Sequence, residues 1–253
     1  MRIARVHHSG AISFAVVEGD EVAELDGPPI GAMRFTGNRA PLSECRLLAP
    51  VLPSKIVAVG RNYAEHAAEF GGDVPEEPLL FLKPSTAVIG PEDPIRKPAG
   101  VTRLDHEAEL AVVVNGLVRN ADEEAAAAAI LGYTCGNDVS ARDYQATDGQ
   151  WTRAKGFDTF CPLGPWIETD IDPYGLRIQG RVNGEVRQDA NTKELTFPPA
   201  FLVSYISKIM TLLPGDVIMT GTPAGVGPVE PGDTVEIEIE GIGVLRNPVV
   251  AGG

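Results

Sequence analysis

Three carboxylates at alternate positions, Asp105, Glu107 and Glu109, form the clearest chemical pattern in the sequence. In a β-strand, residues spaced in this way point to the same face. Residues 110–114, which follow, are all apolar, so the strand is expected to run into a buried region. Buried carboxylates need a cation, and oxygen-rich sites suit Mg²⁺ or Mn²⁺, with Ca²⁺ as a substitute. The strand alone leaves open a second interpretation, an acidic face in contact with solvent.

A further carboxylate, Asp138, lies in a separate segment of mostly small residues, 133–143. A ligand from a second element would complete a metal site and leave positions open for water and substrate. Asn137 and Asp138 are equally typical of a turn or a helix cap, and taken alone the pair favours that simpler interpretation.

Four basic residues occur among small or apolar neighbours: Arg61, Lys83, Arg142 and Lys155. Lys and Arg usually lie on the surface, but a Lys that is buried needs an anion beside it. These residues are therefore candidates to bind an anionic substrate or to balance the carboxylates.

His66 and Glu69 are three residues apart in a segment that predicts a short helix, Tyr63–Phe70, so their side chains can touch. A carboxylate that holds an imidazole in one tautomer makes it a better base. An exposed His–Glu pair without a catalytic role is the commoner outcome of this spacing.

The composition of the 253 residues limits the classes of function. A formal net charge of −14 argues against nucleic-acid binding and requires a local reversal of sign wherever an anionic substrate binds. The three cysteines form no CxxC pair, which is typical of a reducing compartment. Without a recognisable signal peptide or an apolar run of membrane-spanning length, we expect a cytoplasmic protein that does not bind membranes.

The pattern of apolar residues predicts a mixed, β-rich (α+β) fold with about three peripheral helices. Residues 1–50 read as a small N-terminal β domain and residues 51–253 as the catalytic domain, with a linker near Leu48–Pro53 and a mobile loop at 71–78. Helices are expected at Tyr63–Phe70, at Asp122–Leu131 ended by Gly132, and at Pro198–Leu213. Strands are expected at 12–17, 55–60, 107–114 and 235–240, with a hairpin at 176–187 that turns at Asn183-Gly184.

Seven stretches, in order, resemble the fumarylacetoacetate hydrolase family and cover most of residues 50–250. They are VGRNYAEHAAE (59–69), FLKPSTAVIGP (81–91), LDHEAELAVVV (104–114), GYTCGNDVSARDYQ (132–145), KGFDTFCPLGPWI (155–167), RVNGEVRQDANT (181–192) and LLPGDVIMTGTPAGVGP (212–228). Residues 1–50 contain no equally specific motif. The resemblance is to single-domain acylpyruvases and 2-hydroxyhepta-2,4-diene-1,7-dioate isomerases, and it implies a β-roll and a homodimer.

The resemblance also implies a role for each matched residue. Glu107, Glu109 and Asp138 match the metal ligands, whereas Asp105 lies behind them and is not a ligand. His66 and Glu69 match a dyad that activates water on a segment that closes as a lid, and Lys155 matches a lysine near the reacting carbon. The residues expected to bind substrate are Arg61, Tyr63, Lys83, Arg142, Gln145 and Thr222.

These expectations predict a Mg²⁺- or Mn²⁺-dependent hydrolase that cleaves a C–C bond in an acylpyruvate such as fumarylpyruvate or acetylpyruvate. The same enolate chemistry allows an oxaloacetate decarboxylase or a 2-hydroxyhepta-2,4-diene-1,7-dioate isomerase, which the motifs do not separate. A non-enzymatic alternative is a scaffold domain that holds a structural divalent ion in a closed carboxylate cage. The basic residues beside the carboxylates favour the enzyme.

Overall fold

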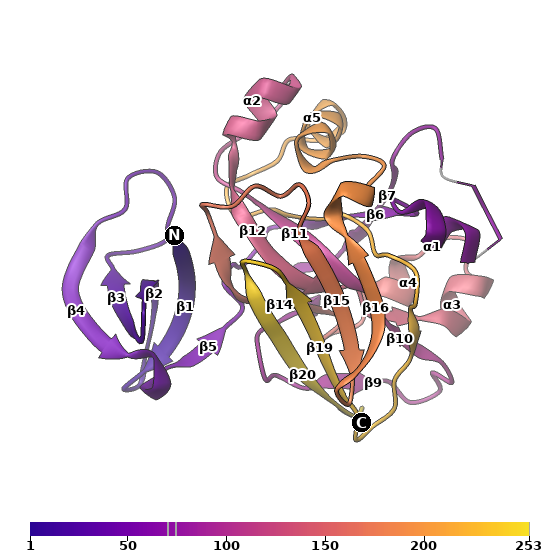
Figure 1. Ribbon diagram of the computed structural model, residues 1–253, viewed down its shortest axis with the longest axis horizontal. Coiled ribbons are helices and arrows are strands. Elements are labelled where there is room, and N and C mark those ends of the chain that lie inside the picture. The colour runs from indigo at the N-terminus through magenta and orange to yellow at the C-terminus, as the bar shows by residue number, and fades with distance from the viewer. Residues whose placement is uncertain (70, 74, 253) are drawn as a thin grey trace.

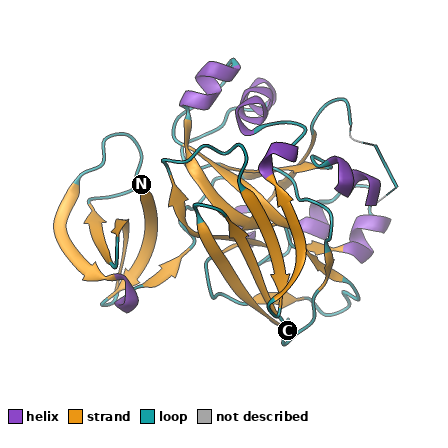
Figure 2. Cartoon of the chain, in the orientation of Figure 1, coloured by secondary structure: helices purple, strands orange, loops and turns teal. Residues whose placement is uncertain are grey.

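Strands dominate the computed structural model, and its helices lie mainly at the periphery, as the sequence predicts (Figures 1 and 2). The structure describes residues 1–69, 71–73 and 75–252. Phe70, the end of the predicted helix 63–70, and Val74, in the predicted loop 71–78, lie outside the described residues.

The first five strands form a small unit at one end of the molecule (Figure 1). They are β1 (Arg2–His8), β2 (Ala11–Glu18), β3 (Glu21–Leu25), β4 (Phe35–Pro41) and β5 (Arg46–Leu48). Strand β4 occupies part of a Gly- and Pro-rich stretch for which the sequence predicted no element, and it forms by pairing with β3. β1 also pairs with β14, so the unit continues the central sheet through shared hydrogen bonds.

The central sheet contains the strand that bears Glu109. Beyond β1 its order is β14-β12-β11-β17-β6-β7, with β8 paired to β14. These strands are β6 (Ile56–Gly60), β7 (Leu79–Lys83), β8 (Val88–Ile89), β11 (Ala108–Val114), β12 (Ile130–Asn137), β14 (Cys161–Glu168) and β17 (Val217–Met219).

Two smaller sheets complete the roll. A five-stranded sheet, β16-β15-β19-β20-β9, packs against the central sheet, where β11 contacts β15 and β12 contacts β19. Its hairpin turns at Asn183-Gly184, as the sequence predicts. The third sheet, β13-β10-β18, lies beside the site. Bounds are β9 (Ile95–Lys97), β10 (Leu104–His106), β13 (Ser140–Ala141), β15 (Arg177–Val182), β16 (Glu185–Asn191), β18 (Gly227–Pro228), β19 (Thr234–Ile239) and β20 (Gly243–Ala251).

Two predicted helices are too long. The predicted helix 122–131 is α2 (Glu123–Ala128), because β12 begins at Ile130 and pairs with β11; Gly132 therefore lies inside a strand instead of ending a helix. The predicted helix 198–213 is α5 (Pro199–Ile209), because Leu212 is drawn into hydrogen bonds with Val118. In both places tertiary pairing overrides local helix propensity.

The other helices are short. α1 (Ala64–Glu69) agrees with the prediction within its described residues, whereas α3 (Arg142–Thr147) and α4 (Thr152–Lys155) were not predicted. The single-turn 3₁₀ segments are Leu42–Glu44, Ser85–Ala87 and Thr192–Glu194. α3 follows the segment that bears Asp138, and Lys155 is the last residue of α4, so the placement of these helices shapes the site.

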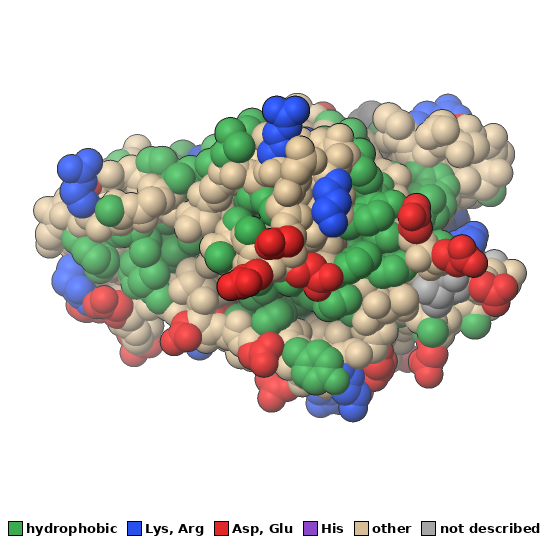
Figure 3. Space-filling model, turned by 90° about the horizontal axis from the view of Figure 1, so that it is seen from above, with side chains coloured by type: hydrophobic (Ala, Val, Ile, Leu, Met, Phe, Trp, Pro, Cys, Tyr) green, Lys and Arg blue, Asp and Glu red, His purple; other side chains and the backbone are tan. Residues whose placement is uncertain are grey.

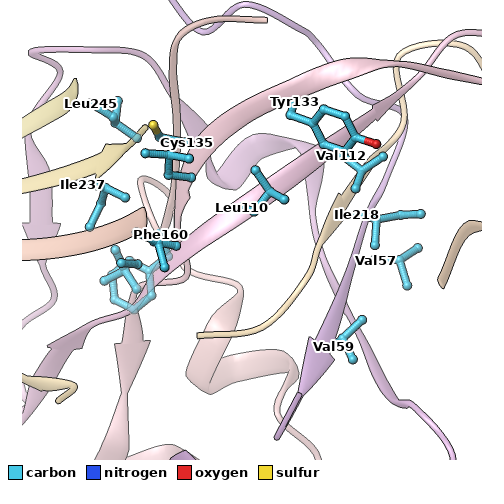
Figure 4. Packing of buried hydrophobic residues seen from close by; sticks show 14 of the residues in the cluster. Val57, Val59, Leu110, Val112, Tyr133, Cys135, Phe160, Ile218, Ile237 and Leu245 are labelled. Carbon is cyan, nitrogen blue, oxygen red and sulfur yellow. The ribbon is translucent and has the colours of Figure 1, made fainter. Parts of the chain in front are cut away.

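Strand β11 is buried on both faces, which explains its uninterrupted apolar run (Figure 4). Leu110 and Val112 pack with Phe160, Ile218 and residues of the second sheet, such as Ile237 and Leu245. On the opposite face, Ala111 and Val113 pack in a second cluster. By the alternation of strand side chains, Glu109 shares the face of Ala111 and Val113.

The surface agrees with a strongly charged chain. On the face shown in Figure 3, acidic and basic side chains are interspersed with hydrophobic ones. Among the described residues, no helix combines the length and the hydropathy that crossing a membrane requires.

Gly132 marks a close approach of β12 to β14. A Cβ at this position would lie 2.4 Å from the carbonyl oxygen of Glu168 and 2.8 Å from a methyl group of Ile167. We expect Gly132→Ala to lower the free energy of unfolding by about 1–3 kcal/mol, because the backbone contact leaves no flexible atom to move aside. Urea denaturation measures the change. Gly116→Ala is the matched control, since its Cβ meets nothing within 4 Å; equal effects of the two substitutions would contradict the prediction.

Candidate active site and metal centre

Three acidic side chains converge where β10, β11 and β12 meet. Glu107 lies between β10 and β11, Glu109 is the second residue of β11, and Asp138 follows the last residue of β12. One oxygen from each lies within 4.8 Å of the others, and all three side chains are buried. The interpretation of this strand as a solvated acidic face is therefore excluded.

The side-chain amide of Asn137 helps to hold the segment of Glu107 beside the segment of Asp138. Its side-chain oxygen accepts a hydrogen bond from the N–H of Glu107 at 3.0 Å. The N–H of Asp138 donates to the carbonyl oxygen of Glu107, also at 3.0 Å. Asn137 and Asp138 are thus a buried connection between two segments, and the interpretation as a simple surface turn does not describe them.

Three basic side chains surround the carboxylates. The Nζ of Lys155 lies 2.8 Å from Glu107 Oε2 and 2.7 Å from Asp138 Oδ2, and Lys83 donates to the other oxygen of Asp138. Arg142 donates to Glu107 Oε1 at 2.6 Å. Both lysines are almost fully buried, so the sequence-based inference that each needs an anion matches what each contacts.

Charge balance differs between the two glutamates. Burial opposes ionisation of Glu107, but the Lys155 and Arg142 charges together hold its pKa well below the usual range. Burial raises the pKa of Glu109 far above its usual value, and the nearby Asp138 and Glu107 charges raise it further. Among the described residues, Glu109 accepts one hydrogen bond, from the N–H of Gly221 at 2.7 Å.

The donor set fits a hard divalent cation. Three carboxylates from three positions supply oxygen ligands, which Mg²⁺ and Mn²⁺ prefer. Glu109 in particular is a buried carboxyl that forms no ion pair within the described part of the chain, and a bound cation would favour its ionised form. Glu107, Glu109 and Asp138 are the residues that would hold the metal.

Asp105 lies behind the carboxylate cluster and organises its basic side. It is fully buried and accepts from Arg142 at 2.8 Å and, through both oxygens, from Arg103 at 2.9 Å. Arg142 also donates to Gln145 Oε1 at 2.6 Å. One carboxylate therefore orients the guanidinium groups of two arginines.

The predicted dyad is assembled on α1. His66 Nδ1 lies 3.3 Å from Glu69 Oε2; His66 is buried at 8% exposure, whereas Glu69 is exposed, so the pair lies at the boundary between interior and surface. Burial lowers the pKa of His66, so its imidazole is neutral near pH 7. Glu69 also accepts from the N–H of Gly225 at 3.3 Å, which ties α1 to the loop after β17.

A cavity of about 340 Å³ joins these groups. Its walls include His66, the three carboxylates and Lys155, together with the predicted substrate-binding residues Arg61, Arg142, Gln145 and Thr222. Two further residues predicted to bind substrate lie outside the lining: Tyr63 is buried at 2% exposure, and Lys83 is behind Asp138.

Comparison with known proteins identifies the family. Residues 55–250 match Fumarylacetoacetate (FAA) hydrolase C-terminal, and residues 1–50 match Rv2993c-like, N-terminal. The chain belongs to the fumarylacetoacetate hydrolase family. Protein Rv2993c of Mycobacterium tuberculosis is 52% identical over 100% of this chain and 99% of its own length. The mitochondrial oxaloacetate tautomerase fahd2 of Xenopus laevis is 46% identical over 82% of this chain and 69% of its own length.

Solved structures of the fumarylacetoacetate hydrolase family share the fold. The 5-carboxymethyl-2-hydroxymuconate delta-isomerase of Mycobacterium smegmatis is 52% identical, with a TM-score of 0.95 over 100% of both chains. A maleylpyruvate hydrolase from Sphingobium sp. SYK-6, solved with manganese(II) and pyruvate, is 34% identical, with a TM-score of 0.82 over 100% of both chains. The family's enzymes thus include isomerases, hydrolases and tautomerases.

Several residues around the cavity were not predicted from the sequence, with or without the family resemblance, among them Arg103, Trp151 and Gln188. Arg103 and Trp151 line it. Gln188 on β16 donates to Thr222 Oγ1 at 2.7 Å and accepts from the N–H of Ala108 at 2.9 Å, so it fixes Thr222 relative to β11. In the sequence, Gln188 stands out only as an uncharged polar residue in the mostly charged stretch 185–189. This pattern does not reveal which residues its amide contacts.

Metal affinity should depend on Glu109, which shares the carboxylate cluster with Glu107 and Asp138. We expect Glu109→Gln to weaken Mn²⁺ binding by at least about tenfold, because a neutral amide offers one weak ligand oxygen in place of a carboxylate. Isothermal titration calorimetry measures the affinity. Asp158→Asn, at an exposed position, is the control of equal charge change; an unchanged affinity in Glu109→Gln would remove this residue from the metal site.

Proposed function

We propose that this chain is a Mg²⁺- or Mn²⁺-dependent enzyme that hydrolyses a C–C bond in an acylpyruvate-type 2-oxo-carboxylate. The observation that carries the proposal is the His66–Glu69 dyad, which contributes its imidazole to the same cavity as Glu107, Glu109 and Asp138. A base beside an oxygen-ligand metal centre is what water-dependent cleavage of a β-diketone requires. Thr222 lines the same cavity, and its hydroxyl, which accepts from Gln188, can donate to the substrate carboxylate.

The chemistry balances with groups of this chain. When bound, the divalent cation supplies Lewis acidity to the 2-oxo-carboxylate end of the substrate. His66, neutral and oriented by Glu69, takes a proton from water as the oxygen attacks the distal carbonyl carbon. The bond between C3 and that carbon then breaks, its electron pair stays on the pyruvate fragment, and C3 takes up a proton. The products are a carboxylic acid and pyruvate.

Lys155 supplies positive charge to the reaction, and the apolar cavity walls exclude water from it. The Lys155 ammonium is 2% exposed and lies at the carboxylate cluster, where it stabilises negative charge that develops on the pyruvate fragment. Phe81 and Trp151 pack edge to face with ring centroids 5.2 Å apart, and both line the cavity. These apolar rings limit the water present and strengthen each electrostatic contact.

A second candidate is proton transfer between carbon and oxygen or between carbons, without cleavage. Relatives at 46–52% identity are named as an oxaloacetate tautomerase and a delta-isomerase, which supports tautomerisation or isomerisation of a related 2-oxo-carboxylate. Decarboxylation of oxaloacetate draws on the same stabilisation of negative charge at C3. Each of these reactions uses Lys155 and the carboxylate cluster, whereas hydrolysis alone needs His66 to activate water.

The scaffold alternative is disfavoured by the basic side chains that line the cavity. A structural ion is held in a closed cage of oxygen ligands, but Lys155 and Arg142 here share a 340 Å³ cavity with the carboxylates. Such a cavity has room for a ligand beside the cation. A cytoplasmic location and a homodimer remain predictions from the sequence.

Oxalate separates the enzyme from the scaffold because it mimics the metal-chelating end of a 2-oxo-carboxylate. We expect millimolar oxalate to raise the melting temperature in the presence of Mn²⁺ or Mg²⁺ and to have no such effect after chelation of the metal, since only a ligand that binds the folded state stabilises it. Differential scanning fluorimetry provides the measurement. Succinate, which lacks adjacent oxygens for chelation, is the control; equal shifts with and without metal would contradict an open metal site.

His66 is expected to separate hydrolysis from proton transfer. We expect His66→Gln to lower hydrolysis of acetylpyruvate by about 10²- to 10⁴-fold, the usual contribution of a general base, while Mn²⁺ affinity is retained. Loss of enol absorbance with acetylpyruvate, fumarylpyruvate and oxaloacetate follows each reaction. His7→Gln, on the exposed surface of β1, is the control. Full hydrolysis in His66→Gln, or a parallel loss of metal affinity, would refute the assigned role.

A further inference from the structure

Gln188 on β16 is a fully buried glutamine that bonds through both ends of its amide. Its Oε1 accepts from the N–H of Ala108 at 2.9 Å, and its Nε2 donates to the carbonyl oxygen of Pro223 at 2.8 Å and to Thr222 Oγ1 at 2.7 Å. A backbone N–H can only donate and a backbone carbonyl oxygen can only accept, so these two backbone partners fix the orientation of the amide. Gln188 is therefore the donor in its contact with Thr222.

This contact sets the direction of the Thr222 hydroxyl. A hydroxyl has one proton and two lone pairs. Because Oγ1 accepts from Gln188, its own proton is left to donate to another group, and Thr222 lines the same cavity as the three carboxylates. A donor at this place suits the oxygen of a ligand carboxylate, which can only accept.

The backbone of β15 leaves room for the Gln188 amide. Gly180 is paired with Gln188 across the hairpin, and a Cβ at position 180 would lie 2.7 Å from Gln188 Oε1, closer than any ordinary contact. The φ of Gly180 is not positive, so backbone strain does not account for a glycine here. A side chain at this position would push the amide away from Ala108, which explains why the residue is a glycine.

The neighbouring metal-ligand contact has a support of its own. The N–H of Gly221 donates to Glu109 at 2.7 Å, and the carbonyl oxygen of Thr220 accepts from the buried side chain of Asn62, also at 2.7 Å. Neither hydrogen bond involves Gln188. Loss of the Gln188 amide is therefore expected to leave Glu109 in place.

We propose that Gln188 is a positioning residue that acts through Thr222, and that it presents the Thr222 hydroxyl as a donor to the carboxylate of a 2-oxo-carboxylate ligand. This inference rests on the proposed function, because it places the ligand carboxylate at Thr222. Without Gln188 the hydroxyl rotates freely, and a ligand must order it on binding, which costs affinity. Gln188 thus raises ligand affinity without touching the ligand or the cation.

A cycle of single and double substitutions tests the proposal. Isothermal titration calorimetry measures the affinity for oxalate in the presence of Mn²⁺ and, separately, the affinity for Mn²⁺. We expect Thr222→Val to weaken oxalate binding by roughly tenfold or more, as for other hydrogen bonds to charged groups, and Gln188→Met by roughly three- to tenfold. In the Thr222→Val background, Gln188→Met should weaken oxalate binding by less than about twofold, because the hydroxyl through which it acts is gone. Mn²⁺ affinity should be unchanged throughout.

Gly180→Ala displaces the Gln188 amide without removing it, so the proposal stays testable if Gln188→Met does not fold. We expect Gly180→Ala to weaken oxalate binding as Gln188→Met does, and to add little in the Thr222→Val background. Gln179→Met is the control, because Gln179 is 7% exposed on the neighbouring strand and its amide accepts from Arg181, away from the cavity. This control should bind oxalate as the unsubstituted enzyme does.

The outcomes distinguish this inference from the proposed function. Unchanged oxalate affinity in Gln188→Met and Gly180→Ala overturns the inference, while the proposed function stands. An equally large effect of Gln188→Met in the Thr222→Val background, or a parallel loss of Mn²⁺ affinity, also overturns it, because Gln188 is then a purely structural residue. If the unsubstituted enzyme shows no metal-dependent binding of oxalate, the proposed function fails and this inference fails with it.

Discussion

Carboxylates buried close together repel one another, and this repulsion explains most of what surrounds Glu107, Glu109 and Asp138. Each of the three is at most 4% exposed, so water cannot screen the charges. Lys155 and Lys83 are drawn into the interior as counter-charges, and Arg142 is held there by Asp105. Among the described residues, Glu109 accepts a hydrogen bond only from the N–H of Gly221, so it is the carboxyl whose ionised form a bound cation would stabilise most.

The same constraint accounts for the position of the dyad and the cavity. A cation can reach the carboxylates only if one side of the cluster is accessible. On that side lies the cavity, and residues of α1, the β6–α1 turn and the loop after β17 line it. Glu69 links two of these segments through its hydrogen bonds to His66 and Gly225. His66, the three carboxylates and the cavity therefore adjoin one another, because the segments that line the cavity also cover the carboxylates.

Local patterns predicted the parts of this structure that depend on neighbours in sequence. Alternation and turn chemistry placed the 176–187 hairpin, and the apolar run after Glu109 correctly indicated a buried strand. Spacing alone could not decide whether the carboxylates were buried, because burial depends on the packing of β11 between two clusters that are distant in sequence. The family resemblance supplied the choice of ligands that spacing had left open.

The predictions that were wrong concern residues whose structure depends on contacts with distant parts of the chain. Ile130 and Leu131 continue a helical pattern, yet β12, which pairs with β11, begins at Ile130. Leu212 likewise pairs with Val118 instead of continuing α5. Asp105 shares its alternation with Glu107 and Glu109, but the ladder breaks at Glu107 between β10 and β11, and Asp105 binds two arginines behind the cluster. Arg103 was missed although it stands two residues before Asp105, and the ion pair between them is consistent with the same alternation.

Gln188 connects the hairpin β15–β16 to the site. Most residues of β16 are exposed, but Gln188 is fully buried. Its amide joins Ala108 on the central sheet to Thr222 at the cavity, although it belongs to the other sheet. A slip of one residue in strand register would turn this amide to the opposite face and release both partners together. Docking of the two sheets therefore fixes the position of the Thr222 hydroxyl relative to Ala108 on the strand that bears Glu109.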